Sequence, residues 1–170
     1  MFTRAGISVQ VTRDVKKREC GLLYNRHIRE NIKLLRNADP GRLEAFAERL
    51  KNKRLKWFKA QQFQDKDDGD PLMSAYRLFL TKLGITPEEA PIVDRQKNKL
   101  IIHSKNFCPT LEACKILGLD TREVCKKLSE EPTQALLRQL HPGLVFKRNY
   151  GSLRPYTPYC EEMIIMEDEQ

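Results

Sequence analysis

The first half of the chain carries apolar residues at helical spacing. Over residues 12–37, leucine and isoleucine recur mostly three or four positions apart, a pattern that predicts an amphipathic helix. Asp39 and Pro40 then have the form of an N-cap followed by proline in the first turn, and this second helix should run to about residue 64. A third helix is expected over residues 71–84, where Gly84 ends it. Residues 1–90 are therefore predicted to form a helical region.

The second half of the chain, residues 91–170, has a mixed pattern. Residues 92–104 place two apolar stretches around a polar centre, which is typical of a β-hairpin, and residues 144–150 and 162–168 predict two more strands. Short helices are expected between these strands, beginning at Cys108, at Asp120 and at Pro132, the last running to Leu140. The chain is thus predicted to be α+β, with a helical N-terminal half followed by a small mixed module that contains an antiparallel sheet.

The excess of positive over negative charge lies in the first 64 residues, within the predicted helical half. Residues 1–64 hold 16 Lys or Arg against 6 Asp or Glu, whereas the remaining 106 residues hold 15 against 17. On the predicted second helix, Arg42, Arg49, Lys53 and Lys56 recur along one face, away from the apolar stripe. Such a face favours RNA or another polyanion as a partner, and the alternative is an ordinary solvated helix surface.

Composition also bears on the compartment. No stretch approaches 18 uninterrupted apolar residues, so no transmembrane span and no membrane partner are expected. The N-terminus lacks the pattern of a secretory signal peptide. The five cysteines are an odd number, which suits reduced thiols or a metal site better than a secreted disulfide framework. These features predict a cytoplasmic protein.

The cysteines of the second half admit three interpretations. Cys108, Cys114, Cys125 and Cys160 could supply four ligands to zinc or an iron–sulfur cluster, although no two of them have the tight spacing usual in such sites. Cys108, at a predicted helix N-terminus, could instead be a catalytic thiolate with His103 as its base. The third interpretation is that Cys114 and Cys125 pack in the core as small hydrophobes.

Several short motifs in residues 100–167 resemble a known group of domains. They are Phe107-Cys108-Pro109, Glu112-Ala113-Cys114, Leu117-Gly118-Leu119-Asp120, Val124-Cys125 and Tyr159-Cys160-Glu161-Glu162. This combination is similar to the L-2-amino-thiazoline-4-carboxylate hydrolase-like modules and, more distantly, to four-vinyl-reductase domains. The resemblance implies an α+β module in which Cys108, Cys125 and Cys160 line a pocket for a small molecule or a metal.

The same segment also resembles an extension found behind deaminase-like tRNA proteins. The chain contains no His-x-Glu and no Pro-Cys-x-x-Cys, so the zinc-dependent chemistry of deaminases is not expected. The resemblance then implies an accessory module without the deaminase, which would suit the basic N-terminal half.

Together these observations favour a sensor or accessory protein that binds a small ligand or metal at a cysteine-lined site and has a basic face for RNA or another polyanion. One alternative is a cysteine-dependent hydrolase that acts on a small C–N bonded substrate. Another is an RNA-binding accessory protein whose cysteines are structural.

Overall fold

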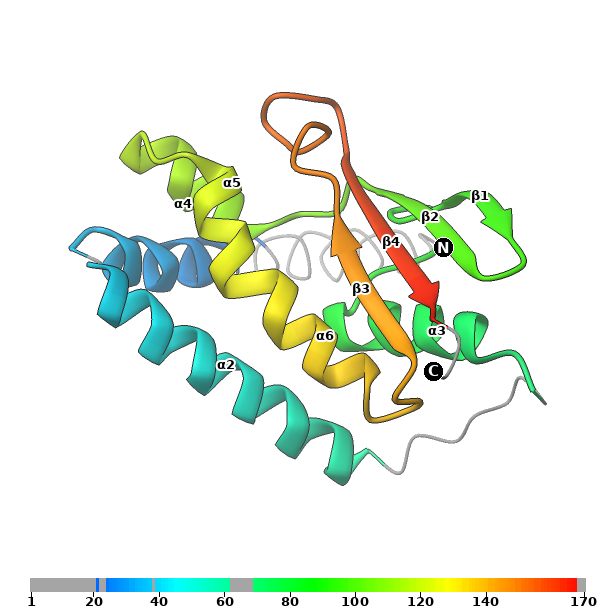
Figure 1. Cartoon of the computed structure of the whole chain (residues 1–170). Helices are drawn as coiled ribbons and strands as arrows, with labels where there is room; N and C mark the ends of the chain where they lie inside the picture. The colour runs from blue at the N-terminus through cyan, green and yellow to red at the C-terminus, as the bar shows by residue number, and fades with distance from the viewer. Residues whose placement is uncertain (1–20, 22–23, 38, 62–68, 168–170) are drawn as a thin grey trace, which may run out of the picture.

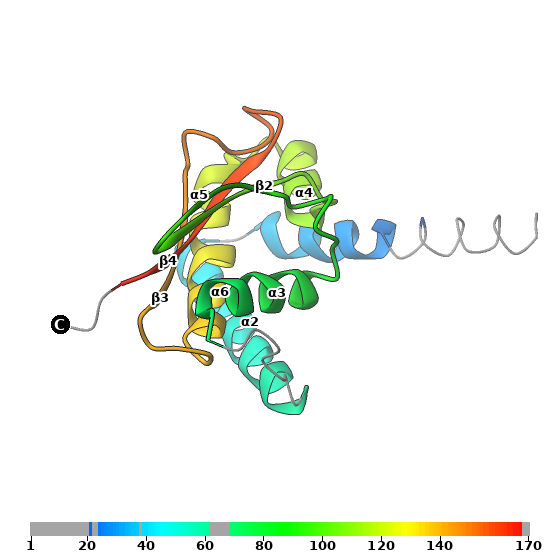
Figure 2. The same ribbon diagram turned by 90° about the vertical axis from the view of Figure 1, so that its right-hand side faces the viewer.

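The computed structural model describes residues 21, 24–37, 39–61 and 69–167. It confirms the α+β architecture, because a four-stranded antiparallel sheet forms in the C-terminal half and helices dominate the N-terminal half. Figure 1 shows the arrangement, and Figure 2 shows the helices gathered on one side of the sheet. Residues 24–35 are helical, as expected, whereas residues 12–20 of the predicted first helix lie outside the described part of the chain.

The next two helices begin and end where local capping chemistry places them. α2 (Pro40–Ala60) begins after Asp39, whose carboxylate accepts a hydrogen bond from the N–H of Arg42 at 2.9 Å. α3 (Pro71–Leu83) begins after Asp70 and ends at Gly84, which adopts a φ of 66° in the left-handed region that favours glycine. These boundaries confirm the predicted caps at Asp39 and Gly84.

The sheet has the strand order β1-β2-β4-β3. Its strands are β1 (Ile92–Gln96), β2 (Lys99–Ser104), β3 (Leu144–Arg148) and β4 (Cys160–Met166). On β2 the buried residues are Leu100, Ile102 and Ser104, so alternate side chains face the helices. The register sets Ser104 opposite Cys160, and this pairing brings the start of β4 beside the end of β2.

The helices between β2 and β3 differ from the prediction. α4 (Pro109–Leu117) begins after Cys108, as expected. α5 (Thr121–Cys125), the π-helix η1 (Lys126–Glu130) and α6 (Glu131–Leu137), however, form one continuous helical segment instead of two separate helices. Pro132 explains the π-turn, because a residue without an N–H cannot make the ordinary helical bond and the wider turn accommodates it.

Two hydrophobic clusters hold the helices and the sheet together. The first joins α3 to the inner face of the sheet and to α6, and it includes Leu78, Phe79, Leu100, Ile102, Leu137, Phe146 and Ile164. The second joins residues 24–35 and α2 to α4, α5 and η1, and it includes Leu35, Ala47, Ala113, Cys114, Val124 and Leu128. Each cluster draws on residues from both halves, so the helical half packs directly on the sheet half. No helix of the described residues is long and apolar enough to cross a membrane.

Candidate functional site

A buried ion pair occupies the inner face of the sheet. Arg148 and Glu162 are cross-strand partners on β3 and β4, and their side chains are only 7% and 4% exposed. The Arg148 guanidinium donates from Nη2 to Oε1 of Glu162, while the Ser104 hydroxyl donates to Oε2 at 2.5 Å. Buried charges are stable only when they are paired and hydrogen-bonded, so this network fixes both side chains.

Positive charge exceeds negative charge around this pair. Arg54 of α2 is close enough to Arg148 and Glu162 for both to affect its charge, and it donates to the hydroxyl of Thr133 at 2.5 Å. Burial lowers the pKa of Arg54 to about 10, and repulsion from Arg148 contributes to this lowering. The Nε of Arg148 is buried and has no hydrogen-bond partner among the described residues.

The loop between β3 and β4 adds a further arginine. Arg154 donates from Nη1 to the carbonyl of Asn106 at 2.8 Å and from Nε to the sulfur of Cys160 at 3.4 Å. These bonds tie the start of β4 to the segment that precedes α4. The guanidinium is therefore held beside Cys160.

Cys108 is the N-cap of α4, and its sulfur accepts a hydrogen bond from the N–H of Leu111 at 3.5 Å. The predicted position at a helix N-terminus is thus confirmed. Burial nevertheless raises the pKa of the Cys108 thiol, although the Leu111 N–H, Arg148 and Arg154 oppose this effect. The direction is opposite to the one that an activated thiolate requires.

Three cysteines that are distant in sequence come together around Arg148. Electrostatic interactions connect Arg148 with Cys108, Cys125 and Cys160, and the three thiols also affect one another. Cys108 and Cys160 are half-buried, whereas Cys125 is buried and burial raises its pKa to about 12. We call this group the cysteine–arginine centre, defined as Cys108, Cys125, Cys160, Arg148, Arg154 and Glu162.

Cys114 has a different environment. It is fully buried in the second hydrophobic cluster, and burial raises its pKa to about 11. Cys114 thus lies where the core-packing interpretation predicts.

His103 lies on the other face of the sheet. Its imidazole stacks on Tyr159 with the ring centroids 3.7 Å apart, and its Nε2 is 3.3 Å from Oε2 of Glu161. Because successive residues of a strand face opposite sides, His103 points away from the face that carries Ser104 and Glu162. The catalytic pair of Cys108 and His103 is therefore not assembled in this structure.

The cysteine–arginine centre does not fit a zinc or iron–sulfur site. No group of three or more His, Cys, Asp or Glu side chains among the described residues is arranged to hold a metal ion. Arg148 and Arg154 also lie close to Cys108, and their positive charges would repel a metal cation bound there. The predicted ligand set of Cys108, Cys114, Cys125 and Cys160 is therefore not arranged around a metal position in the described part of the chain, and Cys114 packs in the second hydrophobic cluster.

The basic face predicted on α2 is present at the surface. Arg42, Arg49, Lys53 and Lys56 are all exposed, and their spacing places them on one side of the helix. The other side of α2 packs against α6 and η1, and Figure 1 shows α2 along the outside of the molecule. We refer to these four residues as the basic face.

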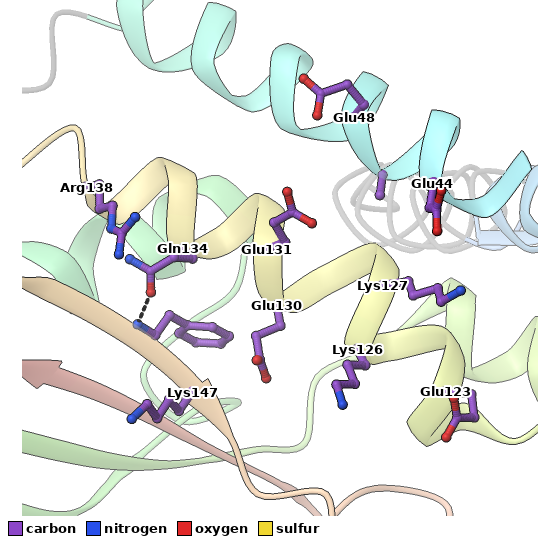
Figure 3. Close-up of a pocket in the computed structure, with 12 residues that line it drawn as sticks. Glu44, Glu48, Glu123, Lys126, Lys127, Glu130, Glu131, Gln134, Arg138 and Lys147 are labelled. Carbon is purple, nitrogen blue, oxygen red and sulfur yellow. Dashed lines mark hydrogen bonds between the residues drawn. The ribbon is translucent and has the colours of Figure 1, made fainter. Parts of the chain in front are cut away.

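An open groove between α2 and the α5–η1–α6 segment has no counterpart in the sequence analysis. Its volume is about 800 Å³, and Figure 3 shows Glu44 and Glu48 of α2 across from residues of the η1 region. Five glutamates, three lysines and one arginine line it. This mixed charge does not favour a polyanion.

The sequence analysis also missed Arg148, Arg154 and Glu162. An arginine and a glutamate in predicted strands are a detectable signal, because charged residues at inward positions require partners. Their pairing itself depends on the strand register, which the sequence pattern does not reveal.

Comparison with protein-family models gives no match to this chain, and no curated protein matches it significantly. The similarity of residues 100–167 to thiazoline carboxylate hydrolase-like modules and to deaminase-associated extensions therefore stays an expectation.

Proposed function

We propose that this protein binds a small, negatively charged ligand at the cysteine–arginine centre. One observation carries the proposal: two half-buried thiols, Cys108 and Cys160, come from separate parts of the chain and have the same arginine neighbours. A ligand that reached these thiols would lie near both guanidinium groups.

The charge of the centre supports an anionic ligand. Among the described residues, Arg148 pairs with the carboxylate of Glu162, Arg154 lies beside Cys160, and Arg54 adds a third positive charge near Arg148. A buried guanidinium N–H without an acceptor is unfavourable, and a ligand oxygen could supply one for Nε of Arg148. The raised pKa of Cys108 favours binding over nucleophilic catalysis, because a neutral thiol is a poor nucleophile.

The proposal can be tested by comparing an anionic with a neutral thiol reagent. Iodoacetate and iodoacetamide alkylate cysteine alike but differ in charge, and mass spectrometry gives the labelling rate at Cys108 and Cys160 separately. We expect the iodoacetate-to-iodoacetamide rate ratio to be higher in the folded protein than in urea. Arg154→Gln should lower this ratio about fivefold, the effect of about 1 kcal/mol of charge interaction.

Lys115→Gln is the matched control, because it removes one positive charge from the exposed face of α4, where Lys115 pairs with Glu112. It should leave the ratio unchanged. A ratio at Cys108 and Cys160 that is the same in folded and unfolded protein would refute the anionic ligand.

We infer a second candidate function, binding of RNA through the basic face. The observation in its favour is that all four predicted cations are exposed on one side of α2. The helix carries seven Lys or Arg and two Glu, a net charge of +5. Such a surface binds phosphates by releasing counterions, and its affinity falls as salt rises.

The test is the fluorescence anisotropy of a labelled single-stranded RNA at several salt concentrations. A variant with all four basic-face residues replaced by glutamine should bind more weakly, and its salt slope should decrease by up to about 0.7 for each phosphate that is no longer neutralised. The matched control replaces four exposed lysines elsewhere: Lys97, Lys105, Lys115 and Lys126. Equal weakening in both variants would show that net charge alone is responsible, not the basic face.

A further inference from the structure

Trp57 of α2 holds a lysine of the neighbouring helix in place. The Nζ of Lys82, near the end of α3, lies 4.5 Å from the centroid of the Trp57 ring. Trp57 is half-buried and packs against the first hydrophobic cluster. Because a cation over an indole face is attracted by the ring, Trp57 restricts the position of the Lys82 ammonium.

Among the residues that the structure describes, the charged groups that affect Lys82 are cations. Partial burial lowers its pKa, and the nearby positive charges of Arg54 and Lys53 lower it further. No carboxylate of the described residues forms an ion pair with Lys53, Lys56 or Lys82. The cluster thus has positive charge that an anion could neutralise.

This cluster continues the basic face. Lys53 lies four residues before Trp57 on α2, and its charge affects Lys82, which sits over the Trp57 ring, so the basic face and Lys82 are neighbours. From Arg42 to Lys56 the basic face is about 21 Å long, at 1.5 Å per residue. A row of that length fits a linear polyanion, whose phosphates repeat along its backbone, better than a single phosphate group.

We propose that Lys53 and Lys82, with Lys82 held over Trp57, form a phosphate subsite that extends the basic face from α2 onto α3, and that its ligand is the backbone of a single-stranded RNA. The inference rests on the RNA-binding candidate function and adds a second helix to the interface. Lys82 contributes a fixed ammonium rather than a freely rotating one, which reduces the entropic cost of binding.

The test measures binding of a labelled oligouridine of about 20 nucleotides, long enough to span the row, to wild type and Lys82→Gln between low and physiological salt. We expect Lys82→Gln to weaken binding severalfold at low salt and to reduce the salt slope by about 0.7, the contribution of one phosphate contact in a single strand. Lys82→Arg keeps the charge over Trp57 and should retain the wild-type slope. Lys97→Gln removes an exposed lysine of the hairpin and should also leave the slope unchanged.

The outcomes separate this inference from the function on which it rests. If the wild type does not bind the RNA even at low salt, the RNA-binding function fails, and the subsite with it. If the basic-face variant does not bind but Lys82→Gln keeps the wild-type slope, the subsite alone is refuted. Urea unfolding of Lys82→Gln detects any weakening of the packing around Trp57, and an equal decrease of slope in Lys97→Gln would overturn the assignment.

Discussion

Glu162→Gln tests the ion pair at the heart of the cysteine–arginine centre. Glutamine has nearly the same shape as glutamate, so the substitution removes the negative charge but leaves the packing of β4 intact. Burial opposes the charge on Arg148, but Glu162 together with Cys125 and Cys160 more than compensates, so the pKa of the guanidinium is raised. With glutamine opposite, Arg148 keeps its charge without a counterion at 7% exposure.

Breaking a buried ion pair from one side costs about 3–5 kcal/mol. Domains of this size are stable by about 5–15 kcal/mol, so Glu162→Gln should remove a large part of the free energy of unfolding. Urea unfolding followed by far-ultraviolet circular dichroism measures the change. Replacing both partners, with Arg148→Met and Glu162→Leu, should cost less than Glu162→Gln alone, because no buried charge is then left without a partner.

Glu161→Gln is the matched control at the adjacent position. Glu161 faces the other side of the sheet, where its partly exposed carboxylate pairs with His103, and surface pairs contribute about 1 kcal/mol or less. If Glu162→Gln and Glu161→Gln cost the same, the argument that Glu162 neutralises a buried arginine is wrong.

Two further predictions concern other parts of the fold. A hydrogen bond from Arg122 lowers the pKa of Asp120 from 3.8 to about 2, so its stabilisation of α5 is complete above pH 3.8 and disappears as the pH falls towards 2. Asp120→Asn should unfold at lower urea than wild type at pH 6, and a gap that persists unchanged at pH 2 would contradict this linkage. Gly143→Ala would place Cβ 2.8 Å from the carbonyl oxygen of Glu167, which should cost about 1–3 kcal/mol in urea unfolding. Gly41→Ala, which meets no contact shorter than 3.4 Å, should be neutral or stabilising, and equal stability of both variants would contradict the clash.

Local features of the fold could be predicted from the sequence because they depend on neighbouring residues. The caps at Asp39, Gly84 and Cys108 each involve bonds within four residues, and the hairpin of β1 and β2 follows from alternation over a short segment. The joining of α5 to α6 could not be predicted in this way. A proline such as Pro132 ordinarily begins a helix, and only packing on both sides makes a π-turn the better solution.

The same distinction applies to the candidate site. Periodicity was sufficient for the basic face, because all four residues belong to one helix. The pairing of Arg148 with Glu162 depends on the register between strands separated by eleven residues of loop, from 149 to 159, which no local pattern determines. The orientation of His103 could have been predicted from the sequence. Side chains alternate along β2, so His103 and Ser104 face different sides of the sheet.

The π-turn at Lys126–Glu130 has a consequence for the angular position of the two helices that it joins. An α-helix advances about 100° per residue, so the extra residue in a π-turn rotates everything after it by roughly that angle. α5 presents Cys125 to the cysteine–arginine centre, and α6 presents Thr133 to Arg54. Without the extra residue, in one continuous α-helix, the side chain of Thr133 would point in a different direction around the helix axis relative to Cys125. The π-turn therefore sets the angle between the side chain that α5 directs to the centre and the one that α6 directs to Arg54, whose charge lies near it.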